Sequence, residues 1–334
     1  MERPLRQMNS PISATAPARN RVGTIVVATD FSSESLKALA YAAALLRQGE
    51  GTLHLVHVLD IDYSFAVPTL LMTEPIVTAP EVGRANEAEL KKLVTKIVGP
   101  QIEAHVHVKC GRAYDQICAV AREVAADLLV IATHGRTGLK HLMLGSTAER
   151  VVQYAPCPVL VVRDDERDPF DPASATAPVR LQKILVPVDF SECAKHGVHY
   201  AIALARRHGA KVVLLHCVQV QPMLPTERYE AFARTPSPGV IERAAKQQMR
   251  RFIRGLDAGD VAVETVMQIG RPAEQICNYA ESQQMDVIVT STHGLTGFAH
   301  VLIGSTAEHV VRYARCPVLV VPRRDRAARV NDNL

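Results

Sequence analysis

The chain has 334 residues and contains no Trp, and aromatic side chains make up only 4% of it. Proteins that bind single-stranded nucleic acids stack the bases on aromatic side chains, so this composition argues against that class. The formal net charge is +4, and the basic residues are spread along the chain instead of forming a stripe. We therefore expect no nucleic-acid partner.

Long apolar runs are also missing. No stretch approaches the roughly 18 consecutive apolar residues that a membrane-spanning helix requires. The first 20 residues contain no apolar segment of the kind that a secretory signal carries, and we interpret 1–20 as a disordered arm. These absences predict a cytoplasmic protein with no membrane partner.

Seven cysteines are present, and none of them lies in a CxxC pair, so we expect neither a zinc site nor a redox centre. Four of them occupy matching places in apolar segments and are interpreted as small buried hydrophobic residues. They are Cys118 with Cys277, and Cys157 with Cys316. For Cys110 and Cys193 a reactive thiol stays an alternative, although no neighbouring motif would lower the pKa of either.

The chain contains two copies of one sequence unit. Shifting the sequence by 159 positions aligns Asp30 with Asp189 and Gly145 with Gly304, and the offset stays constant along the whole unit. The segment between the copies is rich in Pro, Asp and Ala, as linkers are. The expected organisation is an arm at 1–20, a first domain at 21–163, a linker at 164–179, a second domain at 180–322 and a polar tail at 323–334.

Within each copy, short apolar runs alternate with segments of helical periodicity. The opening runs, TIVVATD and KILVPVD, are apolar without alternation, which is typical of strands covered on both faces. Four further runs follow in each copy and end with CPVLVV in both. The pattern predicts the α/β class, with two repeated domains that each hold a five-stranded, mainly parallel sheet flanked by helices.

In such sheets, ligands bind beyond the carboxyl ends of the strands. There the fourth run leads into THG, then nine residues, then Gly-Ser-Thr and a helix, at 133–147 and again at 292–306. A helix start offers unpaired N–H groups and a positive dipole, which suit a phosphate. The alternative is a capping box, in which Ser146 pairs with Glu149 and Ser305 with Glu308. We expect some capping, but it would not explain the glycines, so an anion site is favoured.

Neither copy carries the GxxxxGK[ST] loop or a GxGxxG after its opening strand, so this is not a standard phosphate loop. The ordered set ATDFSSES and PVDFSEC, LVHV and LLHC, two copies of THG-x9-GST and the final CPVLVV resembles the universal stress protein family. The resemblance covers about 21–163 and 180–322. It implies tandem Rossmann-like domains of the adenine nucleotide alpha hydrolase type.

The resemblance also implies a ligand, because the nucleotide-binding branch of the family holds ATP with G-x-x-G-x9-G-[S/T]. Adenine and ribose in the first copy would face Ala28, Thr29, Asp30 and Val58. The ribose and phosphates would be surrounded by Ile131, Ala132, His134, Gly135, Gly145, Ser146 and Thr147. The matching set in the second copy is Pro187, Val188, Asp189, Cys217, Thr290, Ser291, His293, Gly294, Gly304, Ser305 and Thr306.

Several of these positions have a second interpretation or depart from the pattern. Asp30 and Asp189 could accept hydrogen bonds from a sugar or base, or could cap the helix that follows. The first motif glycine is Ala132 in one copy and Ser291 in the other, which would hinder binding only if that position needs a positive φ.

The copies differ in charge inside the loop, where Arg136 and Lys140 of the first are Leu295 and Ala299 in the second. Since cations attract phosphates, Arg136 joins the predicted site and the first copy is predicted to bind more tightly. His134 and His293 lack a second ligand or a paired nucleophile, so neither is expected to bind metal or to catalyse.

These expectations describe a stress-response protein that binds adenine nucleotide, ATP with Mg²⁺, and acts through nucleotide-dependent regulation or association. Two alternatives remain: an interaction module without nucleotide, and a slow ATP hydrolase. Efficient phosphoryl transfer needs a base, a metal-binding carboxylate and a cationic clamp, and only part of the clamp is visible. The resemblance further implies that the two domains pair through their last strands, and a homodimer is plausible.

Overall fold

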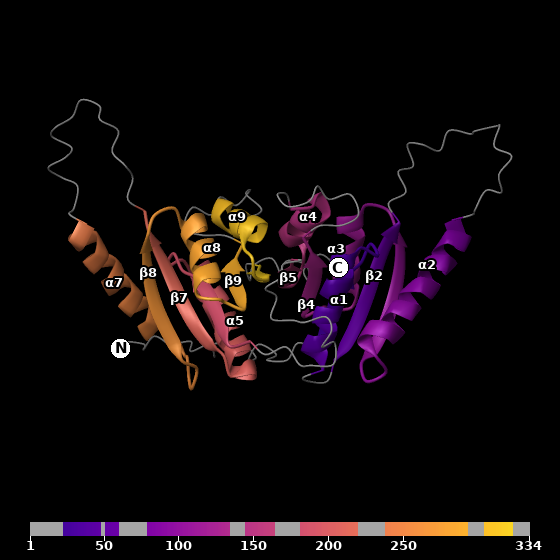
Figure 1. Cartoon of the computed structure of the whole chain (residues 1–334), viewed down its shortest axis with the longest axis horizontal. Helices are drawn as coiled ribbons and strands as arrows, with labels where there is room; N and C mark the ends of the chain where they lie inside the picture. The colour runs from indigo at the N-terminus through magenta and orange to yellow at the C-terminus, as the bar shows by residue number, and fades with distance from the viewer. Residues whose placement is uncertain are drawn as a thin grey trace, which may run out of the picture.

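The computed structural model describes residues 23–47, 51–59, 79–133, 144–163, 181–219, 238–292 and 304–322. Figure 1 shows two α/β halves side by side, with helices on both faces of the strands. None of the helices in these ranges is long and apolar enough to cross a bilayer.

The first half contains five strands and their connecting helices. Its elements are β1 (Thr24–Ala28), α1 (Ser33–Leu46), β2 (Thr52–Leu59), α2 (Ala79–Leu93), the π-helix η2 (Val94–Val98), β3 (Glu103–Cys110), α3 (Ala113–Glu123), β4 (Leu128–Ala132), α4 (Ser146–Tyr154) and β5 (Val159–Val162).

The second half repeats this order. Its elements are β6 (Lys183–Pro187), α5 (Glu192–His208), β7 (Lys211–Val218), α7 (Pro238–Arg254), β8 (Val263–Ile269), α8 (Pro272–Ser282), β9 (Val287–Ser291), α9 (Ser305–Tyr313) and β10 (Val318–Val321). The predicted α/β class with two repeated domains is confirmed.

All ten strands form one sheet in the order β3-β2-β1-β4-β5-β10-β9-β6-β7-β8. Every pairing inside a half is parallel, and the halves meet where β5 runs antiparallel to β10, with Leu160 opposite Leu319. This pairing covers the apolar edge of each closing strand, which would otherwise be free to pair with another chain.

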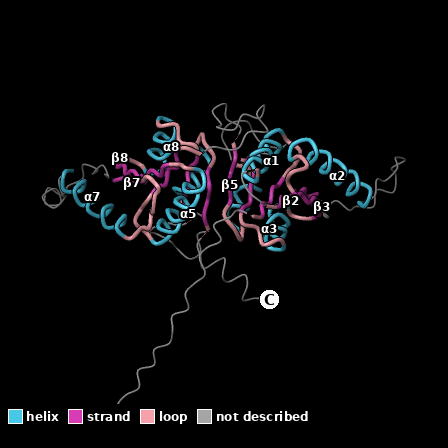
Figure 2. The backbone as a smooth tube through the Cα atoms, turned by 90° about the horizontal axis from the view of Figure 1, so that it is seen from below, coloured by secondary structure: helices cyan, strands magenta, loops and turns pink. Residues whose placement is uncertain are grey.

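Two apolar clusters cover the two faces of the sheet, and each contains residues from both halves. α1 and α5 contribute to one cluster, while α3, α4, α8 and α9 contribute to the other. Figure 2 shows the helices placed on either side of the strands. The central strands are therefore buried on both faces, which explains why β4, β5 and β10 are apolar without alternation.

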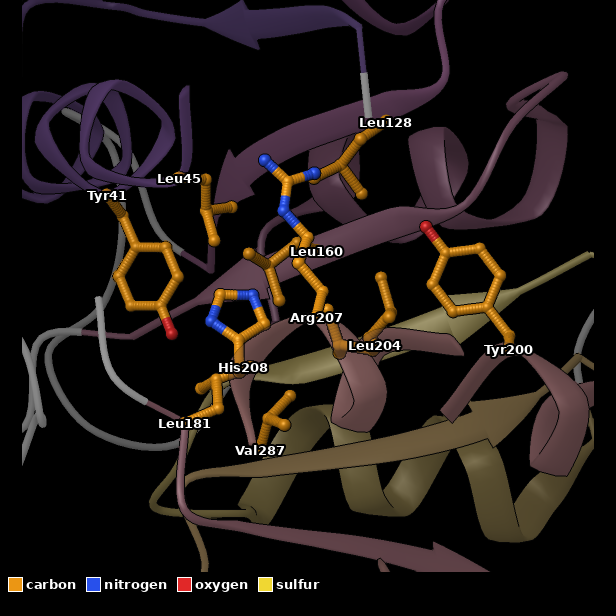
Figure 3. A pocket seen from close by; sticks show the side chains of 11 residues that line it. Tyr41, Leu45, Leu128, Leu160, Leu181, Tyr200, Leu204, Arg207, His208 and Val287 are labelled. Carbon is orange, nitrogen blue, oxygen red and sulfur yellow. The ribbon is translucent and has the colours of Figure 1, made fainter. Parts of the chain in front are cut away.

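The cluster under α1 and α5 contains a small apolar cavity of about 40 Å³ at the seam between the halves. Equivalent residues of the two halves line it together: Tyr41 corresponds to Tyr200, and Leu128 corresponds to Val287. Figure 3 shows the two tyrosines on opposite sides of Leu160. The core is thus incompletely filled at the seam.

Candidate functional site

At the end of β1 and of β6, the chain makes the same sharp turn into a helix. Phe31 and Phe190 both have φ of +67°, which is a strained conformation for a bulky side chain. The ring of Phe31 lies 4.5 Å from that of His57, and the ring of Phe190 lies 4.3 Å from that of His216, measured between centroids. These ring contacts help to hold the strained turn in place.

The two histidines also fasten this turn to the neighbouring strand. His57 Nδ1–H donates to the carbonyl oxygen of Thr29 at 2.9 Å, and His216 Nδ1–H donates to that of Val188 at 2.8 Å. Each histidine is therefore a structural residue at the carboxyl edge of the sheet. The sequence signal for this role was that, in both halves, a histidine follows the Asp-Phe-Ser motif at the same distance along the sequence.

The alternative prediction, that Asp30 and Asp189 cap the helices that follow them, is wrong. The N-caps are Ser32 and Ser191, whose side chains accept from the N–H of Ser35 and Ala194. Asp30 Oδ1 accepts from the Ser32 N–H at 3.1 Å. Asp189 Oδ1 does the same for the Ser191 N–H at 3.0 Å. Each aspartate orders the turn before the cap and does not cap the helix itself, because a serine two residues later occupies that position.

The predicted capping boxes at the second corner are wrong. The N-caps of α4 and α9 are Gly145 and Gly304, which make no side-chain cap, so Ser146 and Ser305 are the first helical residues. The carboxylate of Glu308 faces forward along its helix and pairs with Arg312 at 3.0 Å. Among the described residues, no side chain caps the first N–H groups of these helices, which lie at the carboxyl edge of the sheet.

This corner is closed at its base by one hydrogen bond in each half. Gly145 N–H donates to the Thr133 carbonyl oxygen at 2.8 Å, and Gly304 N–H donates to that of Thr292 at the same distance. The bond brings the end of the fourth strand of each half next to the helix start, although ten or more residues separate them in sequence. His134, Gly135, Arg136, His293 and Gly294 of the predicted site lie outside the described residues.

The substituted first glycines occupy ordinary strand positions. Ala132 ends β4 and Ser291 ends β9, and neither is among the residues with positive φ. The backbone conformation at these positions therefore does not require glycine, and alanine and serine fit without strain. Replacement of the motif glycine by Ala132 or Ser291 therefore does not hinder a ligand through backbone strain.

In the second half, the carboxyl ends of β6, β7 and β9 and the start of α9 surround a cavity of about 620 Å³. All nine predicted residues of this half that lie in the described ranges line it: Pro187, Val188, Asp189, Cys217, Thr290, Ser291, Gly304, Ser305 and Thr306. Ligand pockets for small molecules typically have volumes of about 300–1,000 Å³, so this cavity has the size of a nucleotide site.

One wall of this cavity was missed by the sequence reasoning. Ile241, Ala244 and Gln248 of α7 also line it. Their spacing of three and four residues places them on one face of the helix, and this periodicity was the available signal. The wall combines apolar surface with one amide, whereas the α9 side supplies backbone N–H groups and hydroxyls. The cavity thus has one face suited to a flat apolar group and another suited to an anion.

The thiol of Cys217 also faces this cavity. Burial raises its pKa to about 11, and its Sγ–H lies 3.9 Å from the carbonyl oxygen of Pro272. A thiol with so high a pKa is almost fully protonated at neutral pH and behaves as a small apolar residue. The same burial raises the pKa of Cys118 to about 11 and of Cys157 to about 12. Cys277 and Cys316, which were also expected to be buried, are only half-buried.

In the first half, the equivalent described residues occupy the same strand ends and helix start. They are Ala28, Thr29, Asp30, Val58, Ile131, Ala132, Gly145, Ser146 and Thr147. The main difference is Thr29, whose hydroxyl lies 2.9 Å from that of Ser35 and accepts from the Phe31 N–H at 3.0 Å. The second half has an apolar Val188 there, so the floor of the first corner is more polar.

Two copies of a doubly wound parallel sheet, each with a helix start at its carboxyl edge, define the class of Rossmann-like α/β proteins. The family model described as "Universal stress protein family" matches residues 22–163 and 180–322. The chain therefore belongs to the universal stress protein family.

Relatives match either most of this chain or less than half of it. Universal stress protein Rv2005c of Mycobacterium tuberculosis is 28% identical over 301 residues, which cover 89% of this chain and 96% of the relative. Universal stress protein MJ0531 of Methanocaldococcus jannaschii is 32% identical over 145 residues, covering 42% of this chain and 82% of its own. The crystal structure of a universal stress protein from Archaeoglobus fulgidus matches with a TM-score of 0.60 at 20% identity, covering 91% and 97% of the two chains, and supports the fold.

Proposed function

We propose that this universal stress protein binds adenine nucleotide, as ATP with Mg²⁺, at the carboxyl edge of each half and acts in the cytoplasm by nucleotide-dependent regulation or association. The single observation that carries the proposal is the cavity of about 620 Å³ that the nine residues of the second half line. The same nine residues are those that the sequence motifs predict for the site.

The chemistry of the cavity matches the parts of a nucleotide. The first turn of α9 directs N–H groups at the phosphates, and Ser305 and Thr306 add hydroxyl donors. Asp189 also lines the cavity, and its carboxylate suits the ribose hydroxyls. The apolar side of α7 offers Ile241 and Ala244 to the flat face of the base.

Regulation requires that nucleotide binds two states of the protein with different affinity. The cavity wall from α7 belongs to a different element from the wall made by α9, so a bound nucleotide bridges them. Bridging would favour the arrangement in which the two helices lie closest. In this proposal, binding of the nucleotide changes how strongly one chain associates with another.

The proposal is tested by measuring ligand directly. The full chain is purified without added nucleotide, and the absorbance at 260 nm of the released small molecules is recorded after denaturation. Isothermal titration calorimetry of ligand-free protein with ATP, with and without Mg²⁺, then gives affinity and stoichiometry, and GTP serves as the control ligand. We expect up to two ATP sites per chain and weaker binding of GTP. No retained nucleotide and no heat at millimolar ATP would favour the interaction module instead.

Slow hydrolysis is measured in the same preparation. Release of inorganic phosphate from ATP by the full chain, followed over hours, should stay far below the turnover of about 1–100 per second that kinases show. Turnover in that range would contradict a binding role and would make the chain an enzyme.

A further inference from the structure

The first half carries three histidines that the repeat does not require. His54 lies on β2, and His105 and His107 lie on β3. The residues at the same repeat positions in the second half are Val213, Glu264 and Val266. Since β7 and β8 form the same strands with those residues, the histidines are not needed to build the sheet.

The three side chains lie together on one face of the two outer strands. His54 is in register with His105, and residues two apart on a strand point to the same side. The rings of His54 and His105 are stacked with centroids 4.9 Å apart. His54 Nδ1 and His107 Nε2 are 3.0 Å apart and share one proton. All three line a surface hollow of about 570 Å³ beside Lys91 and Thr95.

The separation of the two nitrogens fits two ligands of one metal ion. Zn–N bonds are about 2.0–2.1 Å long, so two nitrogens are roughly 2.9 Å apart at a right angle and roughly 3.3 Å apart in a tetrahedron. The observed 3.0 Å lies within this interval. To accept an ion, each ring has to turn its lone pair by roughly 40° away from the other nitrogen and toward one shared point, because Zn–N bonds of about 2.0–2.1 Å form a triangle with the N···N line.

Binding of an ion would replace the hydrogen bond between the two rings. The ring that now donates its proton within the pair shifts to its other tautomer, so that both facing nitrogens offer a lone pair to the ion.

The charges around the pair are balanced. Lys91 is paired with Glu87 at 2.6 Å, and Lys109 with Glu123 at 3.5 Å. Glu103 lies on β3 with His105, and its Oε1 is 3.1 Å from His105 Nε2. A divalent cation thus meets no unopposed positive charge from the residues described around this hollow.

We propose that His54 and His107 form a two-imidazole site for a divalent transition-metal ion such as Zn²⁺ or Ni²⁺, with water completing the coordination. Imidazole nitrogen is a preferred ligand of both metals. Over the described ranges, no three His, Cys, Asp or Glu side chains already converge as a metal site, so the site is an open one and not a closed structural one. It lies on the outer strands of one half and is independent of the proposed nucleotide cavity.

The test compares the full chain with a double variant, His54→Val and His107→Val, after treatment with a chelator. The new residues are those of the second half and favour strands, so the fold should be kept, and far-UV circular dichroism verifies this. Zn²⁺ is titrated by calorimetry at pH 7.5, and Ni²⁺ is titrated in parallel. A third protein with His199→Gln, at an exposed histidine of α5, serves as the control.

The full chain and the control should bind Zn²⁺ with affinities within about two-fold of each other, and the double variant should bind at least about ten-fold more weakly at this site. Zn²⁺ should also raise the melting temperature of the full chain and not that of the folded double variant, because ligand that binds only the native state stabilises it. Equal Zn²⁺ affinity of the full chain and the double variant, or no binding at about millimolar Zn²⁺, would overturn the proposal.

Discussion

Replacing Ser305 with glutamate should weaken ATP binding in the second half without harming the fold. Ser305 is the first residue of α9, and its side chain is exposed and lines the cavity. A carboxylate at a helix start stabilises the helix by about 0.3–1 kcal/mol, because it complements the dipole. The same carboxylate would stand where a phosphate is expected, so fold and binding respond in opposite directions.

The magnitude follows from Coulomb's law. Two unit charges roughly 5 Å apart repel by about 0.8 kcal/mol in water and by about 3 kcal/mol at an effective dielectric constant near 20. Because Ser305 is exposed, screening by solvent places the effect at about 1–2 kcal/mol. That loss corresponds to roughly 5- to 30-fold weaker binding of ATP.

The assay is calorimetric titration of ATP into the full chain, its Ser305→Glu variant, the matching Ser146→Glu variant and the double variant. Gln247→Glu on α7 is the control, since it adds the same charge at an exposed position outside the cavity lining. Each single variant should weaken one of two sites, and the double variant both. Because Arg136 and Lys140 are present only in the first half, Ser146→Glu should weaken the tighter of the two sites. If the double variant is folded and binds ATP with unchanged affinity and stoichiometry, the helix starts are not phosphate sites.

Three further predictions concern stability and thiol chemistry. Ala125 has φ of +47°, so Ala125→Gly should raise the free energy of unfolding by about 0.5–1 kcal/mol in urea denaturation, and an unchanged or lower value would contradict the strain. Val287→Leu adds one methylene to the seam cavity and should stabilise by up to about 0.8 kcal/mol, whereas a lower melting temperature would show that the cavity cannot accept it. Cys110 is exposed while burial raises the pKa of Cys217 to about 11, so iodoacetamide at pH 8 should label Cys110 first by peptide mass spectrometry. Faster labelling of Cys217 would refute this order.

A fourth prediction concerns the anchor of each opening strand. Asp127 Oδ2 accepts from the N–H groups of Gly23 and Thr24 at 2.8 and 2.9 Å. Asp127→Ala leaves both donors without this partner and should lower the free energy of unfolding by about 2–3 kcal/mol. The Asp286→Ala variant, which removes the same contact in the second half, should lose a similar amount. A change below about 0.5 kcal/mol in both variants would show that water replaces the carboxylate.

The sequence was sufficient to predict the α/β class and the twofold repeat. A constant offset forces the two halves to share one set of strands and helices, and buried parallel strands must be apolar throughout. The residues at the strand ends could also be selected, because ligands of such sheets lie at the carboxyl edge. The periodicity of α7 was visible as well, but nothing in the sequence indicated which strand ends its apolar face would cover.

Local patterns failed where two short motifs competed for one position. Ser-x-x-Glu at the start of α9 suggested a capping box, yet the preceding glycine takes the cap and Glu308 pairs with Arg312. The Asp-Phe-Ser turn suggested an aspartate cap, yet the serine takes it. A shift of one or two residues in where a helix begins is decided by the strand before it, so only the folded chain fixes it.

By itself, the sequence determined the repeat and the strand and helix order, because both follow from local periodicity and from the constant spacing between the copies. The candidate residues at each carboxyl edge came from the resemblance of the motifs to the universal stress protein family. Only the tertiary structure decided that the ten strands join into one sheet through β5 and β10, that α7 closes the cavity, and that His54 comes within 3.0 Å of His107. These features depend on contacts between residues far apart along the chain, and such contacts are set by packing across the whole sheet and leave no local pattern to read.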